Sequence, residues 1–172
     1  MIIDEQGCGL TNFHVVADML AERRGLAGLS SGYLYDLEVL GIDPGGDVAM
    51  FRLSGQHDAS ASARDASASA RDASPTARDA SGSSRDACAE RYPFAPLGDS
   101  DAVRLGDPVL AMGNPFVLAE DYTPTVTSGR VTGVHRYQYG EGNQLLYSDC
   151  IQTDAAVNPG NSGGQLVDEE GA

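Results

Sequence analysis

Residues 158–164 read Asn158-Pro159-Gly160-Asn161-Ser162-Gly163-Gly164, and the interpretation of the whole chain begins with them. One serine lies among glycines on a turn that starts with Asn-Pro. Because glycine adopts positive φ without steric cost, its N–H groups can point into one small space. Such a turn can present a hydroxyl group and also cradle an oxyanion. Clusters of Gly, Asn, Ser and Pro also form ordinary turns, so the interpretation depends on partners elsewhere in the chain.

Two upstream residues are of the types that could act with this serine. His14 lies in Gly9-Leu10-Thr11-Asn12-Phe13-His14-Val15-Val16-Ala17, where an apolar strand end meets a Thr-Asn capping signal, so we expect it at the start of a short helical turn. Asp47 follows a Pro-Gly-Gly turn at the head of an apolar strand, whereas Asp43, the alternative, precedes the proline on the outer side. Taken singly, a buried histidine and a turn-capping aspartate also explain these residues.

Together the three residue types fit one kind of chemistry. A serine that attacks a carbonyl group needs a base to take its proton, and that base needs a carboxylate to fix its tautomer and stabilise the imidazolium. The chain order is His14, Asp47, Ser162. This is the order of chymotrypsin and not that of subtilisin or the α/β-hydrolases.

The chain resembles the protease domain of the HtrA (DegP-like) family in six blocks that occur in family order and cover most of the sequence outside one insertion. The blocks are Thr11-Asn12-Phe13-His14-Val15-Val16, Gly46-Asp47-Val48-Ala49-Met50, Leu97-Gly98-Asp99-Ser100, Leu105-Gly106-Asp107-Pro108-Val109-Leu110-Ala111-Met112-Gly113-Asn114-Pro115-Phe116, Ser128-Gly129-Arg130-Val131 and Ile151-Gln152-Thr153-Asp154-Ala155-Ala156-Val157-Asn158-Pro159-Gly160-Asn161-Ser162-Gly163-Gly164.

The resemblance implies a role for each site residue. His14 is expected to be the general base, Asp47 its orienting carboxylate and Ser162 the nucleophile. The backbone N–H groups of Gly160 and Ser162 would form the oxyanion hole, with Asn161 between them. In many chymotrypsin-like zymogens, an aspartate before the serine pairs with the N-terminus that cleavage creates. Asn161 cannot form this ion pair, so control by prodomain cleavage is not expected. Loop rearrangement is the alternative that the family offers.

The composition limits the partners and the cofactors. The chain has 172 residues, 41% of them hydrophobic and none of them Trp, so its core must be aliphatic. A net charge of −14 argues against nucleic acid and anionic membranes, which bind basic patches. Three cysteines form neither a disulfide framework nor a zinc signature. We expect Cys8 and Cys150 to be buried and Cys88 to be exposed, and the proposed chemistry requires no metal or other cofactor.

We predict an all-β protein of two chymotrypsin-like antiparallel β-barrels, the second incomplete, with a disordered repeat insertion. Residues 1–57 would form the first barrel and residues 92–172 the second. Residues 58–91 hold the insertion, in which a seven-residue Asp-Ala-Ser unit ending in Arg recurs. Its only apolar residues are small, which argues against a coiled coil.

Periodicity and turn residues predict where the elements lie. We expect a helix at Val15–Arg24 and a loop at Gly25–Gly32. His135 and Tyr137 would follow a strand end at the surface, and His57 has no expected role. The predicted strands are Met1–Ile3, Cys8–Thr11, Tyr33–Ile42, Asp47–Leu53, Asp107–Met112, Thr123–Val134 and Leu145–Gln152.

The function expected from these features is a serine endopeptidase that cleaves unfolded or damaged polypeptides through an acyl-enzyme. The family resemblance implies an extracytoplasmic, periplasmic location and a homotrimer in the full-length protein. The family also has further strands after the nucleophile, so we expect this chain to be a fragment that is poorly active and prone to association. A non-catalytic, chaperone-like or peptide-binding module is the alternative. A serine esterase is disfavoured by the chain order and by the lack of a Gly-x-Ser-x-Gly elbow.

Overall fold

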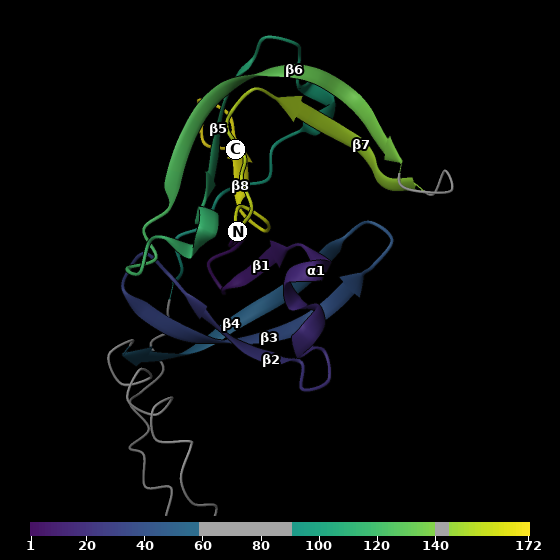
Figure 1. The fold of residues 1–172 in the computed structure, drawn as a ribbon. Coiled ribbons are helices and arrows are strands. Elements are labelled where there is room, and N and C mark those ends of the chain that lie inside the picture. The colour runs from purple at the N-terminus through teal and green to yellow at the C-terminus, as the bar shows by residue number, and fades with distance from the viewer. Residues whose placement is uncertain (59–90, 140–144) are drawn as a thin grey trace, which may run out of the picture.

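The computed structural model describes residues 1–58, 91–139 and 145–172, which form two antiparallel four-stranded sheets with only short helices (Figure 1). The first sheet has the order β1-β4-β3-β2 and the second β7-β6-β5-β8. The all-β prediction with two antiparallel units is therefore confirmed. No helix in the described ranges is long and apolar enough to cross a membrane. The strands are β1 Cys8–Thr11, β2 Arg24–Gly28, β3 Tyr33–Asp43, β4 Val48–Asp58, β5 Pro108–Gly113, β6 Thr125–Tyr139, β7 Leu145–Thr153 and β8 Gln165–Val167.

The helical elements are single turns at the strand connections. The α-helix α1 spans Phe13–Val16, directly after β1, and continues into the 3₁₀ helix η1, Ala17–Met19. Two further 3₁₀ helices, η2 and η3, flank β5 and span Ser100–Ala102 and Pro115–Val117. The site residues of the first sheet thus come from the corner after β1 and from the turn between β3 and β4.

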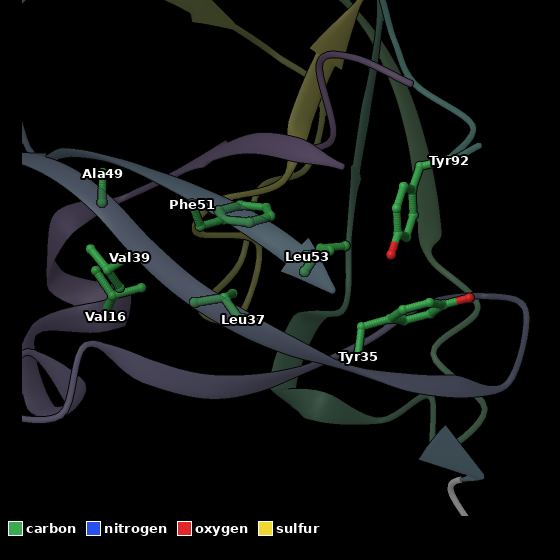
Figure 2. Close-up of a cluster of buried hydrophobic side chains, with 8 residues drawn as sticks. All are labelled: Val16, Tyr35, Leu37, Val39, Ala49, Phe51, Leu53 and Tyr92. Atoms are coloured by element: carbon green, nitrogen blue, oxygen red, sulfur yellow. The ribbon is translucent and has the colours of Figure 1, made fainter. Parts of the chain in front are cut away.

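The first core forms because buried and exposed residues alternate along much of β3 and β4. Successive side chains of a strand point to opposite faces, so every second residue can be buried on one face. The register places Leu37 opposite Leu53 and Val39 opposite Phe51. α1 adds Val16, which is almost fully buried. Figure 2 shows the resulting cluster: Val16, Tyr35, Leu37, Val39, Ala49, Phe51, Leu53 and Tyr92.

The second sheet has smaller buried residues and a strongly curved strand. Its buried hydrophobic residues include Val109 and Ala111 of β5, Val131 of β6 and Val167 of β8. In Figure 1, β6 curves in a long arc that β7 follows only in part. The β6–β7 pairing contains several register shifts between Val131 and Tyr139, and such bulges bend a strand and increase its twist.

Several predicted boundaries are wrong. The helix expected at Val15–Arg24 stops early, and the first half of the expected loop at Gly25–Gly32 belongs to strand β2. Pairing with β3, from Arg24↔Glu38 to Gly28↔Leu34, overrides the weak strand propensity of two glycines. Residues 165–167 form β8, a strand that the sequence did not predict.

The ends of the long strands also differ from the prediction. β4 continues to Asp58, and β6 continues to Tyr139, so His135 and Tyr137 lie within a strand. Cys8 is buried as predicted, but Cys150 is partly exposed because β7 is an edge strand. Cys88 and nearly all of the predicted 58–91 insertion lie outside the described residues, and the proposed domain boundaries stay predictions.

Candidate active site

The corner between β1 and α1 is bonded directly to the turn between β3 and β4. Asn12 is extended, with φ −75° and ψ 145°, and α1 begins after it. The N–H of Phe13 donates to the carbonyl oxygen of Asp47 at 3.1 Å. Asp47 has φ 52°, in the left-handed region, which aspartate tolerates better than most residues. This backbone conformation brings the carboxylate to the side of His14.

His14 and Asp47 form a two-point contact. The backbone N–H of His14 donates to Asp47 Oδ1 at 2.9 Å, and His14 Nδ1 lies 2.8 Å from Asp47 Oδ2. The side-chain amide of Asn12 also donates to the Asp47 carbonyl oxygen at 3.0 Å and to Oδ2 at 3.3 Å. Since an ionised carboxylate only accepts hydrogen bonds, these donors favour a charged Asp47 and an imidazole with its proton on Nδ1.

The environment of Asp47 sets its charge at neutral pH. Burial favours the protonated acid, but hydrogen bonds from the backbone and ring of His14, together with that of Asn12, outweigh it and hold the pKa of Asp47 below its ordinary value. The side chain of Asp47 is 14% exposed, whereas that of His14 is 53% exposed. The result is a shielded carboxylate that supports an imidazole open to solvent on its other side.

All three histidines of the chain pair with an aspartate, so the pairing alone does not define a site. His57 lies 3.1 Å from Asp36, and both side chains are about half exposed, at 49% and 57%. His135 lies 2.6 Å from Asp149, and these side chains are 64% and 55% exposed. Exposed pairs of this kind are weak and screened by solvent. Only the first histidine has a shielded carboxylate.

Asp43, the alternative carboxylate, is hydrogen-bonded within its own turn. Its Oδ1 accepts a hydrogen bond from the N–H of Gly45 at 3.0 Å. Its side chain makes no contact with His14 among the hydrogen bonds and ion pairs of the described residues. The geometry therefore pairs Asp47, and not Asp43, with His14, and the catalytic role of this pair stays a prediction.

Backbone hydrogen bonds hold the turn that carries Ser162. The N–H of Asn161 donates to Asn158 O at 3.0 Å, and Gly160, the third residue of that turn, has φ +101°. Proline second and a positive-φ glycine third are typical of a type II turn. The N–H of Gly163 donates to Asn12 Oδ1 at 2.7 Å. The turn bearing Ser162 is thereby attached to the segment that precedes His14.

Two of the five N–H groups of residues 160–164 have no acceptor among the described residues. Within the described part of the chain, the N–H groups of Asn161, Gly163 and Gly164 all donate hydrogen bonds, whereas those of Gly160 and Ser162 do not. Ser162 is exposed, and its hydroxyl makes no hydrogen bond to the described residues. No hydrogen bond therefore joins His14 to Ser162 within the described part of the chain.

The loop that follows β5 packs against the same turn. The N–H of Phe116 donates to Pro159 O at 2.8 Å. A Cβ atom at Gly160 would lie 2.7 Å from both Asn114 O and Phe116 N, so only glycine fits between these segments. Asn161 Oδ1 is buried beside Gly113 and has no partner within the described residues. Sequence reasoning did not predict this support, and the side-chain contacts of Asn12 were also missed, because the capping signal at Thr11-Asn12 explained that residue locally.

Two antiparallel β units, with a His–Asp pair in the first and a glycine-flanked serine in the second, define a chymotrypsin-like peptidase architecture. Comparison with known families agrees: the family model described as a trypsin-like peptidase domain matches residues 1–172. The chain belongs to this family.

The relatives also confirm the predicted resemblance to HtrA proteins. The chain is 33% identical over 172 residues to the periplasmic serine endoprotease DegP of Escherichia coli K12, covering 99% of this chain and 27% of that protein. It is 34% identical over 170 residues to the mitochondrial serine protease HTRA2 of Bos taurus, covering 99% and 28%.

A solved structure supports the fold. The HtrA-type protease AlgW with a decapeptide superposes with a TM-score of 0.66 at 31% identity, covering 99% of this chain and 39% of AlgW. The chain spans about a quarter of the length of the curated relatives that it matches.

Proposed function

We propose that this chain is the catalytic domain of a serine endopeptidase with His14 as general base, Asp47 as its orienting carboxylate and Ser162 as nucleophile. Asp47 holds Nδ1 of the imidazole, so Nε2 is the nitrogen left to accept the serine proton. Ser162 Oγ then forms a bond to the carbonyl carbon of the scissile peptide. The imidazolium returns the proton to the leaving amine as the C–N bond breaks, and the acyl group stays on Ser162.

Deacylation repeats these steps with water. Water loses a proton to His14 as its oxygen bonds to the acyl carbon, and the Ser162–acyl bond breaks as that proton returns to Oγ. In both halves the carbonyl oxygen becomes negative. The N–H groups of Gly160 and Ser162, which have no acceptor among the described residues, are the donors for it. Removal of one such donor typically costs about 10²–10³ in kcat.

The substrates proposed are unfolded or damaged polypeptides. The relatives are named as serine endoproteases or serine proteases, several of them periplasmic, which supports polypeptide substrates. That these polypeptides are unfolded or damaged is what the resemblance to the HtrA family implies. The related AlgW has been solved with a decapeptide. The periplasmic relatives support a proposed extracytoplasmic location, and the resemblance to the HtrA family is the ground for a proposed homotrimer.

The observation that carries the proposal is the shielded His14–Asp47 pair joined through Asn12 to the turn of Ser162. A fluorophosphonate probe, which bonds covalently to an activated serine, tests it. Labelling of the chain, and release of peptides from casein, should both disappear in Ser162→Ala. Labelling that is unchanged in Ser162→Ala would refute the assignment. Casein binding without labelling or cleavage would support a non-catalytic, peptide-binding module.

A further inference from the structure

Asn12 occupies a helix N-cap position, but its side chain does not cap the helix. No side-chain capping bond is made at the start of α1. Instead, Nδ2 donates to Asp47 and Oδ1 accepts from Gly163, residues that lie 35 and 151 positions away in the sequence. One side chain of the first sheet thus connects the carboxylate of the proposed triad to the turn that carries the nucleophile.

The chemistry of the partners fixes the orientation of this amide. The Asp47 carbonyl and carboxylate oxygens can only accept, so they require the Nδ2 group. The backbone N–H of Gly163 can only donate, so it requires Oδ1. A flipped amide would lose the contacts on both sides, and both partners therefore specify the same orientation.

We propose that Asn12 is a positioning residue that fixes the distance between the His14–Asp47 pair and the turn of Ser162. This inference rests on the proposed function. The backbone at Gly163 has φ +78° and approaches Thr11 so closely that a Cβ atom would collide with Thr11 Oγ1. The two segments are therefore in direct contact, and among the described residues Asn12 supplies the side-chain hydrogen bond between them. A misplacement of about 1 Å between reacting groups can cost about 10²-fold in rate.

The matched variants are Asn12→Ala and Asp4→Ala. Asp4 Oδ1 accepts from the N–H groups of Gln6 and Cys8, each at 2.9 Å, in the turn before β1. Each substitution thus removes side-chain hydrogen bonds to two backbone groups. We expect Asn12→Ala to slow fluorophosphonate labelling by about 10–100-fold and Asp4→Ala to leave it unchanged, with comparable losses of thermal stability.

A second variant separates the two ends of the contact. Asn12→Asp keeps an acceptor for the N–H of Gly163 but loses the donor to Asp47 and adds a negative charge. We expect Gly163 to keep its protection from amide hydrogen exchange, whereas in Asn12→Ala it loses protection. Because a nearby negative charge favours the imidazolium, the rise of labelling rate with pH should move to higher pH in Asn12→Asp. A merely structural role would lower the stability of Asn12→Ala but leave the labelling rate of its folded form unchanged.

The outcomes separate the two proposals. Unchanged protection of Gly163 in Asn12→Ala, or equal slowing in Asp4→Ala and Asn12→Ala, would overturn the positioning role of Asn12. Wild-type labelling no faster than that of Ser162→Ala would instead overturn the proposed function. In that event the exchange pattern at Gly163 still decides whether Asn12 holds the two segments together.

Discussion

Replacement of Asp47 by asparagine should trap the imidazole of His14 in the wrong tautomer. Asp47 Oδ1 accepts from the backbone N–H of His14, which cannot become an acceptor. The asparagine oxygen must therefore take that place, and its NH₂ group faces His14 Nδ1. Nδ1 then accepts a hydrogen bond, the ring proton moves to Nε2, and no lone pair is left for the proton of Ser162. The fold should survive, because asparagine tolerates the left-handed conformation at φ 52°.

The expected magnitude follows from this geometry. A triad histidine held in the wrong tautomer loses about 10⁴ in kcat, or about 5.4 kcal/mol at about 1.36 kcal/mol for each factor of ten. The loss of stability is smaller, because the introduced asparagine would keep the bond to the His14 backbone and only the contacts at Oδ2 change. Hydrogen bonds to a charged group are worth about 1.5–3 kcal/mol, so the free energy of unfolding should fall by about that amount or less.

The assay is the rate of fluorophosphonate labelling of wild type and Asp47→Asn, with thermal unfolding measured on the same samples. Asp43→Asn is the matched control, since Asp43 lies on the same turn and, among the described residues, its carboxylate accepts only from Gly45. An asparagine oxygen accepts that bond equally well, so this variant should label at the wild-type rate. The wrong tautomer predicts a far larger loss than tenfold, so the reasoning is refuted if folded Asp47→Asn is labelled at a rate within about tenfold of wild type. It is also refuted if Asp43→Asn is labelled as slowly as Asp47→Asn.

Three further predictions concern stability. The pKa of Asp47 lies below its ordinary value of 3.8, so the ionised carboxylate stabilises the fold above that pH. This contribution to stability is lost as the pH falls through the lower pKa of the folded state. The melting temperatures of wild type and Asp47→Asn should therefore differ at about pH 6 and converge in acid. Phe51→Ala should lower the free energy of unfolding in urea by about 3–5 kcal/mol, whereas Met50→Ala, on the opposite face of β4 and 38% exposed, should cost much less. Gly28→Ala should lower the free energy of unfolding by about 1–3 kcal/mol because a Cβ there collides with the ring of Tyr122. Most of this loss should vanish in the Tyr122→Ala background. An equal loss in both backgrounds would contradict the contact.

The sequence predicts the sheets well where alternation and turn residues agree. β3, for example, shows period-two burial at Tyr35, Leu37 and Val39, and the Pro-Gly-Gly turn ends it and leads into β4. The contact of His14 with Asp47 follows from the residue types and their order, which the family resemblance made specific. These features are local or carried by a motif, so one sequence suffices to predict them.

The features that sequence could not predict depend on tertiary pairing. Gly25 and Gly28 lower strand propensity, yet β2 forms because β3 offers a partner edge and because the side chains of Met19 and Tyr122 pack closely over the two glycines. A capping pattern explains Asn12 locally and so conceals its contacts to remote segments. Long-range contacts of this kind have no periodic signal, so only the folded arrangement shows them.

Four of the thirteen described residues with positive φ lie in the two halves of the candidate site. Asp47 and Phe116 have φ 52° and 57°, and Gly160 and Gly163 have φ +101° and +78°. Such conformations cost of order 1–3 kcal/mol in a residue other than glycine and persist only where the surroundings impose them. Asp47 is held by its bonds to the corner before α1, and Phe116 by its N–H bond to Pro159 O. Each half of the candidate site thus contains one strained non-glycine residue, and hydrogen bonds to a segment remote in the sequence hold it in place. Relaxation of either residue would release a bond that holds part of the candidate site, which links local backbone strain to the alignment that the proposed chemistry requires.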